Sequence, residues 1–271
     1  MEYLQNLHTH STYCDGKDTP EEMILAAIRK GFFSIGFSSH SYMHFSRGWS
    51  MAIEKTEDYK NEIRTLAEKY KDEIDVFCGL EVEMLSEIDL SGYDYLIGSA
   101  HYFKLGESYV GFDRSAEAVK DVIDTNFGGD GMKYAKEYYN HLSRLPEYGN
   151  FDIIGHFDLI TKHSDNVTFF DEDSKEYKDA ALSAVHALNG KIPFFEVNTG
   201  AIARGYRKTP YPAPFILKEL RQLGFGAVIS SDCHNSEFLD CCFDDAVDLL
   251  KECGFAERYI LTKKGFVPVS L

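Results

Sequence analysis

The sequence lacks several features that define large classes of proteins. It contains no run of about 18 apolar residues, which a membrane-spanning helix would need. Residues 1–5 have neither the basic nor the apolar region of a signal peptide, so we expect a cytoplasmic location and no membrane partner. No glycine-rich phosphate loop follows the first apolar stretch, which argues against a nucleotide-binding open sheet.

Basic residues and paired cysteines are also scarce. The chain has 28 Lys and Arg against 44 Asp and Glu, which gives a formal net charge of −16. Such a surface does not neutralise nucleic-acid phosphates, so we expect no nucleic-acid partner. The six cysteines include no Cys-x-x-Cys pair, and reduced, mostly buried thiols are the ordinary state in a cytosolic chain. Cys14 and Cys233 adjoin candidate metal ligands, and nothing in the sequence makes either a nucleophile.

The remaining composition is that of a compact globular protein with regular alternation of strands and helices. Of the 271 residues 44% are apolar, and only seven are proline. Short apolar runs predict strands over residues 3–8, 32–38, 74–82, 93–100, 151–156, 193–197 and 226–231. Amphipathic patterns predict helices over residues 20–30, 54–71, 115–125, 132–147, 173–189, 214–223 and 243–253. Because no linker interrupts this alternation, we expect residues 1–271 to form one parallel α/β domain, either an open sheet or a closed barrel.

The C-terminal ends of the predicted strands carry histidines and carboxylates. Six of the ten histidines lie at these ends, and every predicted strand ends beside a His, Asp or Glu. In a parallel barrel the strand ends share one face, where such folds build their active sites. If the extended chain continues through residues 3–10, His8 and His10 point to the same face, because side chains alternate along a strand.

This residue set predicts a metal site with more ligands than one ion needs. The candidate ligands are His8, His10, Asp15, His40, Glu81, His101, His156, Asp232 and His234. Histidine and carboxylate without cysteine suit Zn²⁺, Mn²⁺ or Fe²⁺. Three divalent ions would use all nine if one carboxylate bridges two of them, and clusters of this kind are hydrolytic.

The motifs that carry these ligands resemble the polymerase and histidinol phosphatase (PHP) superfamily along essentially the whole chain. They are His8-Thr9-His10-Ser11, Cys14-Asp15-Gly16, Ser39-His40, Gly79-Leu80-Glu81, Ser99-Ala100-His101, Gly155-His156 and Ser231-Asp232-Cys233-His234. Length, layout and the Asp15-Gly16 variant look most like the monofunctional histidinol-phosphate phosphatases. The resemblance implies a distorted (β/α)7 barrel with a trinuclear metal centre at the strand C-termini.

The resemblance also implies which residues hold each ion. His8, His10, Glu81 and Asp232 would hold the first, and a metal-bound hydroxide there would attack phosphorus. Glu81 would bridge to a second ion on His101 and His156, while Asp15, His40 and His234 would hold the third. Many relatives have His in place of Asp15, which bears on the metal preferred at that position.

Residues near the predicted mouth are candidates for binding a small phosphate ester, histidinol phosphate. Arg204 and Arg207 would meet the phosphate, with Arg47 and Arg114 as weaker candidates. The imidazole and the amine would meet acidic or aromatic side chains: Glu83, Glu196, Asp158, Asn198, Tyr42, Phe103 and Tyr206. Glu83 could instead orient a metal ligand. The sequence ranks neither the arginines nor the acid that protonates the leaving group, and it leaves the native metal and the oligomeric state open.

Three other functions stay open at this point. The chain could be a PHP-type phosphatase for phosphotyrosine or a nucleotide, or a nuclease, although the acidic composition disfavours the nuclease. An amidohydrolase or deaminase barrel also begins with His-x-His, but it commonly uses a bridging Lys where this chain has Glu81 and His101. A metal-stabilised binding module without turnover is the non-enzyme alternative.

Overall fold

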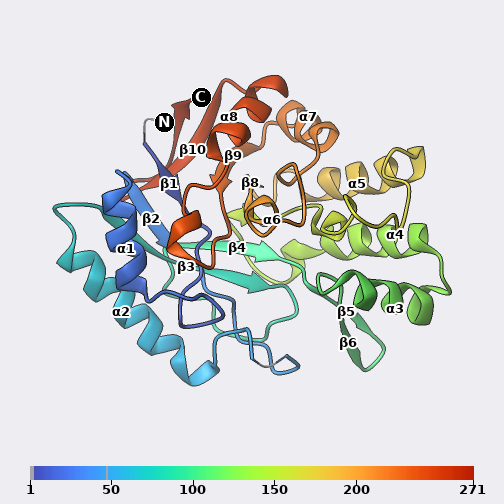
Figure 1. Ribbon diagram of the computed structural model, residues 1–271, viewed down its shortest axis with the longest axis horizontal. Coiled ribbons are helices and arrows are strands. Elements are labelled where there is room, and N and C mark those ends of the chain that lie inside the picture. The colour runs from blue at the N-terminus through green and yellow to red at the C-terminus, as the bar shows by residue number, and fades with distance from the viewer. Residues whose placement is uncertain (1–2, 47) are drawn as a thin grey trace.

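A parallel sheet of seven strands forms the centre of the molecule in a computed structural model that describes residues 3–46 and 48–271 (Figure 1). Neighbouring strands follow the order β1-β2-β3-β4-β7-β8-β9, and every pair is parallel. The strands are β1 Gln5–Asn6, β2 Ser34–Phe37, β3 Asp75–Glu83, β4 Tyr95–Ser99, β7 Ile153–Ile154, β8 Phe194–Asn198 and β9 Gly226–Ser230. Each lies within or overlaps a predicted strand, and five of them are shorter than predicted, while β3 and β8 have the predicted length.

The sheet nearly closes on itself because the chain beyond β1 pairs with the chain beyond β9. A parallel bridge joins Thr9 to Cys233, and His10 N donates to Cys233 O at 2.9 Å. This closure confirms the predicted (β/α)7 barrel and excludes the open sheet. It is a distorted barrel, since β1 and β7 contribute only two residues each to the ladder.

Helices surround the barrel, with α1 and α2 on one side and α3, α4 and α5 on the opposite side (Figure 1). They are α1 Pro20–Arg29, α2 Thr56–Lys69, α3 Ala116–Phe127, α4 Gly131–Leu142, α5 Lys175–Leu188, α6 Gly200–Ala203, α7 Pro214–Gln222 and α8 Phe243–Glu252. Short 3-10 turns occur at Ile53–Lys55, Leu145–Glu147, Leu159–Thr161 and Ser236–Phe238. Thr19 and Glu22 form the predicted capping box at the start of α1. No helix in the described part of the chain is long and apolar enough to cross a membrane.

Two antiparallel hairpins were not predicted. Strands β5 (Tyr102–Leu105) and β6 (Ser108–Gly111) form the first, between the predicted strand 93–100 and the predicted helix 115–125. Strands β10 (Glu257–Thr262) and β11 (Gly265–Ser270) form the second. The second hairpin attaches to the barrel through Gln5, whose Nε2 donates to Leu261 O at 2.8 Å while its Oε1 accepts from Leu261 N at 2.8 Å.

A small apolar cluster fills the barrel interior below the strand ends. The buried residues are Leu7, Phe77, Tyr95, Ile97, Ile153, Val228 and Leu261. The Tyr95 hydroxyl crosses the barrel and donates to Leu7 O and to Phe37 O. Gly36 and Gly79 make room for that ring, because a Cβ atom at either position would overlap it. This packing leaves the C-terminal strand ends as the polar end of the barrel.

Candidate metal centre

All nine predicted ligands lie at the polar end of the barrel, directly in or after its strands. His8 and His10 follow β1, His40 follows β2, and Glu81 lies in β3. His101, His156, Asp232 and His234 follow the later strands, and Asp15 lies in the turn after β1. His8 and His10 are 0% exposed and Glu81 is 1% exposed, so their polar atoms cannot turn to solvent. Charged groups buried this deeply require partners or a metal.

The innermost group consists of four ligand atoms with mutual distances that suit one ion. Glu81 Oε2 lies 3.3 Å from His8 Nε2 and 3.7 Å from His10 Nε2. Asp232 Oδ1 lies 3.1 Å from His10 Nε2 and 3.7 Å from His8 Nε2. Tetrahedral ligands bound at 2.0–2.1 Å are separated by roughly 3.3 Å. His8 Nε2, His10 Nε2 and Glu81 Oε2 have no hydrogen-bond partner among the described residues, so a cation fits between them.

The second oxygen of Glu81 faces a different pair of histidines. Its Oε1 atom lies 2.9 Å from His156 Nε2 and 3.4 Å from His101 Nε2. Each oxygen of this carboxylate therefore has its own set of imidazoles, which is the arrangement of a carboxylate that joins two ions.

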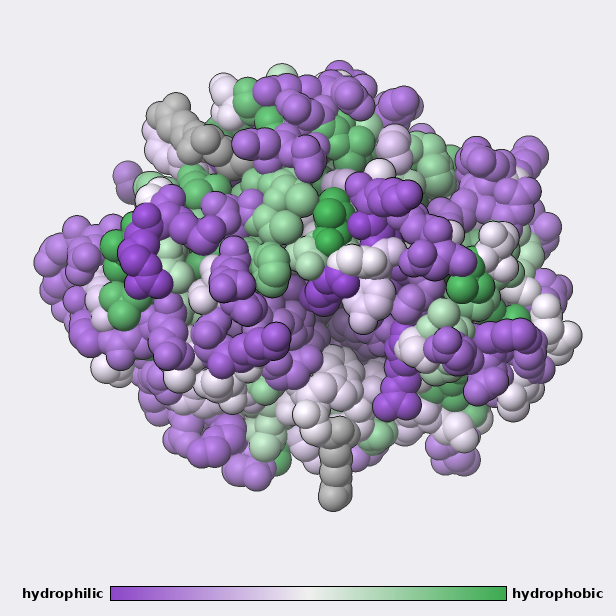
Figure 2. All heavy atoms as spheres, viewed as in Figure 1, coloured by the Kyte–Doolittle hydropathy of each residue, from purple (hydrophilic) through white to green (hydrophobic). Residues whose placement is uncertain are grey.

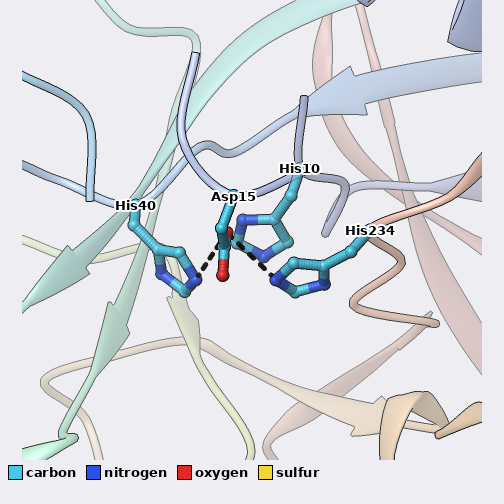
Figure 3. A group of neighbouring side chains, drawn as sticks. All are labelled: His10, Asp15, His40 and His234. Atoms are coloured by element: carbon cyan, nitrogen blue, oxygen red, sulfur yellow. Dashed lines mark ion pairs between the residues drawn. The ribbon is translucent and has the colours of Figure 1, made fainter. Parts of the chain in front are cut away.

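The outer group is centred on the Asp15 carboxylate, which lies between two histidine rings (Figure 3). Asp15 Oδ1 lies 3.2 Å from His234 Nε2 and 3.6 Å from His40 Nε2. The His10 ring stacks on His234 with centroids 4.0 Å apart, so His10 belongs to both the inner and the outer groups. His40 is also shared, since its Nδ1 atom lies 2.6 Å from Glu81 Oε2.

Two carboxylates that we expected to contact substrate instead hold ligand histidines. Glu196 Oε2 lies 2.8 Å from His8 Nδ1, and its Oε1 accepts from His156 N at 2.6 Å. Glu83 Oε2 lies 3.1 Å from His101 Nδ1 and accepts from His101 N at 2.7 Å. Both side chains are buried, and their contacts support the alternative given for Glu83, in which it orients a metal ligand. Such bonds direct the opposite ring nitrogen toward the metal position.

Replacing Glu196 by glutamine is expected to weaken metal binding by about 10–100-fold, because His8 loses the carboxylate that orients its ring. Glu83→Gln should have a similar effect through His101. Equilibrium titration of the metal-free protein with Zn²⁺ measures both affinities. Wild-type affinity in both variants would show that these carboxylates do not support the ligands.

The electrostatics of the cluster keep its carboxylates charged. Burial alone would raise the pKa of Glu81, but His40, His8 and His101 lower it well below its usual value. Burial opposes ionisation of Asp232 as well, yet the Arg204 guanidinium and His8 lower its pKa in the same way. Two anionic carboxylates therefore face the histidine nitrogens, as divalent cations require.

A cavity of about 410 Å³ opens above the ligands. Figure 2 shows a hollow near the centre of this face of the molecule, with hydrophilic side chains gathered around it. Besides six of the proposed ligands, its lining consists of Trp49, Tyr102, Asp113, Arg114, Leu159, Lys162, Arg204 and Tyr206. All eight of these residues lie between the predicted strands and helices.

The two arginines predicted to bind phosphate have different positions. Arg204 lines the cavity, and its guanidinium donates to Asp232 Oδ2 and to Asp232 O, both at 2.9 Å. Arg207 does not belong to the lining. It bonds Thr161 O at 2.9 Å and lies over the Tyr211 ring. The phosphate contact of Arg207 stays a prediction, and Arg204 is the one of the two that lines the cavity.

Several other predicted contacts lie away from the cavity lining and stay predictions. Tyr42 is half-buried outside the described lining, and Phe103 is buried in the core beside Phe112. Asp158 Oδ2 accepts from Ala213 N, and Asn198 bonds Glu196, so both serve the loops behind the site. Arg47 lies outside the described residues.

Five residues of the cavity wall, including Leu159, were missed from the sequence. Trp49 lies between the predicted strand 32–38 and helix 54–71, and Tyr102 and Asp113 lie between the predicted strand 93–100 and helix 115–125. Lys162 follows His156 by six residues. The position of these loops beside ligand-bearing strand ends was the available signal, because loops at the C-terminal face of a barrel form its active site.

The parallel barrel and the cluster of histidines and carboxylates at its strand ends define a barrel protein with a candidate multinuclear metal centre. Comparison with known families agrees, since the model of the PHP domain family matches residues 6–200. The chain therefore belongs to the PHP domain family, and the resemblance predicted from its motifs is confirmed.

Curated relatives match nearly the whole chain. A probable histidinol-phosphatase of Deinococcus radiodurans is 29% identical over 268 residues, covering 94% of this chain and 95% of that protein. The histidinol-phosphatase of Bacillus subtilis is 24% identical over 253 residues, covering 84% of this chain and 92% of its own length.

Solved structures support the fold. The putative histidinol phosphatase of Listeria monocytogenes superposes with a TM-score of 0.75 at 20% identity, covering 89% of this chain and 99% of that chain. The histidinol phosphate phosphatase of Lactococcus lactis, solved in complex with zinc, L-histidinol and phosphate, gives a TM-score of 0.73 at 21% identity. It covers 98% of this chain and 99% of its own.

Proposed function

We propose that this chain is a metal-dependent phosphomonoesterase that hydrolyses L-histidinol phosphate to L-histidinol and phosphate in histidine biosynthesis. The observation that carries the proposal is the set of buried atoms of His8, His10 and Glu81 that make no hydrogen bond among the described residues and face one another beneath an arginine-lined cavity. The names of the relatives supply the substrate. In this proposal residues 1–271 form one catalytic domain that acts in the cytoplasm.

Three divalent ions, Zn²⁺, Mn²⁺ or Fe²⁺, would fit the three groups of ligand atoms. The ions would activate a water molecule for attack on phosphorus and offset the charge of the phosphate. The residues His8, His10, Glu81 and Asp232 would hold the innermost ion, and Glu81 would share its other oxygen with the ion at His101 and His156. The group Asp15, His40 and His234 would hold the third, with His10 close to it.

The side chains of the site favour attack by water over a covalent phosphoenzyme. Cys14 Sγ lies 3.4 Å from His10 Nδ1, but burial and the neighbouring Asp15 raise the pKa of its thiol to about 11. Burial likewise raises the pKa of the Cys233 thiol to about 12. Both thiols stay protonated near neutral pH and are poor nucleophiles.

Arg204 lies in the cavity wall and holds the Asp232 carboxylate in place through a hydrogen bond.

The direct test is release of inorganic phosphate from L-histidinol phosphate by purified protein loaded with Zn²⁺ or Mn²⁺. We expect kcat/KM for this ester to exceed the values for phosphotyrosine, p-nitrophenyl phosphate and a nucleoside monophosphate. A higher value for one of those esters would favour another PHP phosphatase, and absence of phosphate release from all of them would refute phosphomonoesterase activity.

The amidohydrolase alternative has less support from the geometry. In the described part of the cluster the Glu81 carboxylate lies between His8 and His10 on one side and His101 and His156 on the other, where those enzymes commonly use a bridging Lys. The lysine of the cavity wall, Lys162, lies beside Asp113 and is no member of the clustered ligands.

Replacing Arg204 by methionine is expected to lower kcat/KM by about 10–100-fold, because charge-assisted hydrogen bonds contribute about 1.5–3 kcal/mol each. Steady-state phosphate release gives kcat and KM separately, and metal analysis shows whether Asp232 still holds its ion. Arg207→Met is the matched control. It removes the bond to Thr161, so it should lower the melting temperature while KM changes little. A larger KM change in Arg207→Met than in Arg204→Met would reverse the assignment.

A further inference from the structure

Some charged residues of the cavity wall suit the phosphate of a phosphate ester, and one does not. Arg114, Lys162 and Arg204 supply positive charge, which suits the phosphate. Among the described residues of the lining, Asp113 is the one carboxylate outside the proposed ligand set. A carboxylate would repel a phosphate dianion, so Asp113 suits a positively charged part of the substrate, in addition to its neighbour Lys162.

Asp113 is held in a fixed position beside the proposed metal ligand His101. The preceding residue, Phe112, is 1% exposed, and its backbone N donates to His101 O at 3.0 Å. Lys162 Nζ donates to the backbone carbonyl of Asp113 at 2.6 Å but lies 3.6 Å from carboxylate atom Oδ2. The Asp113 side chain is 28% exposed. Lys162 is thus engaged mainly by the carbonyl, and the carboxylate keeps an accessible face in the cavity.

Aromatic rings line the same cavity. Trp49 Nε1 donates to Ser46 Oγ at 2.7 Å, and Ser46 Oγ lies 2.8 Å from Tyr102 Oη. The Trp49 ring meets His40 edge to face, with centroids 4.4 Å apart. Rings fixed in this way, together with a carboxylate, provide the chemistry that recognises an organic ammonium group.

We propose that Asp113 determines specificity by binding the ammonium group of the leaving alcohol, with Trp49 and Tyr102 as the walls of that subsite. The inference rests on the proposed phosphatase function and deepens it. The preferred substrates are phosphate esters of amino alcohols, and their phosphate lies at the metal ligands while their ammonium pairs with Asp113. Asp113 acts on binding and selectivity and takes no part in bond cleavage.

The test compares two esters that differ in the amine alone: L-histidinol phosphate and the imidazolyl-propanol phosphate that lacks it. Wild-type protein should prefer the amine-bearing ester in kcat/KM. Asp113→Asn should reduce that preference by about 10–100-fold, the range expected for one hydrogen bond to a charged group. Asp113→Glu should restore part of the preference. Asp124→Asn is the charge-matched control, since Asp124 is exposed on α3 and lies outside the cavity lining.

A structural role for Asp113 gives a different result. If Asp113 serves only to position Lys162, then Asp113→Asn and Lys162→Met slow both esters alike and the preference stays unchanged, which overturns the proposal. Absence of an amine preference in wild-type protein overturns it as well. Fluorescence of Trp49, the single tryptophan of the chain, gives a readout without turnover. L-histidinol should bind more weakly to Asp113→Asn than to wild type.

Failure of the proposed function can be recognised separately. It would appear as wild-type hydrolysis of p-nitrophenyl phosphate with no hydrolysis of L-histidinol phosphate. The inference is then tested with phosphoethanolamine against ethyl phosphate, which again differ in the amine. Selectivity for phosphoethanolamine that is lost in Asp113→Asn supports the subsite, and its absence refutes it.

Discussion

Replacing Glu81 by glutamine is expected to lower kcat by about 10³-fold or more, equivalent to roughly 4 kcal/mol of transition-state stabilisation. The carboxylate offers Oε2 to His8 and His10 and Oε1 to His101 and His156. A glutamine amide cannot serve both groups, because the amide is uncharged and its NH₂ end donates hydrogen bonds and offers no lone pair to a metal ion. Metal binding at the innermost group and at His101 and His156 should therefore weaken together, while the outer group keeps its ligands.

Asp15→Ala is the matched comparison for that experiment. Asp15 contacts His40 and His234 of the outer group and is partly exposed, so its loss should remove about one ion per chain and reduce kcat less than Glu81→Gln. Metal analysis of the purified variants, phosphate release and circular dichroism measure occupancy, turnover and folding. Equal metal loss in both variants would show that Glu81 does not join two positions.

The barrel could be predicted from the sequence because each strand is a short apolar run, followed by a helix with its own boundary signals. Thr19 and Glu22 at the start of α1 are an example, since the capping box is a local property of four residues. Closure was harder to predict. It depends on pairing between residues 9 and 233, and on a Tyr95 ring that needs the glycines of two other strands. Such contacts join distant parts of the chain and leave no local pattern.

The same distinction applies to the site. Ligand residues could be recognised because strand ends of a barrel meet at one face, whatever the loops do. The roles of Glu83 and Glu196 could not, since a carboxylate on a buried strand can face either the cavity or a neighbouring imidazole. Only the fold places Glu196 beside His8 Nδ1. The hairpin β5–β6 and the loop around Trp49 depend on packing between Ser46 and Tyr102, which are 56 residues apart in the chain. The sequence predicts no helix or strand in either segment.

Removing bound metal with a chelator is expected to abolish activity and to lower the melting temperature by about 8–16 °C. An ion present at 1,000 times its Kd stabilises the folded state by about 4 kcal/mol. In a chain of this size each kcal/mol corresponds to about 2–4 °C. Differential scanning calorimetry of chelated and Zn²⁺-restored protein measures the shift. An unchanged melting temperature after complete removal of metal would mean that the cluster does not couple ion binding to folding.

Protons should compete with the ions for this cluster. Burial opposes protonation of His8, but the carboxylates of Glu196, Glu81 and Asp232 raise its pKa well above the usual value in the metal-free protein. His8 therefore carries a proton near neutral pH that an ion must displace. Metal affinity should fall as the pH falls, by up to about tenfold per unit for one released proton. Calorimetric Zn²⁺ titrations in two buffers of different ionisation enthalpy count the released protons. In His8→Gln, which has no titrating imidazole at this position, fewer protons should be released, and a count equal to that of wild type would assign the proton to another group.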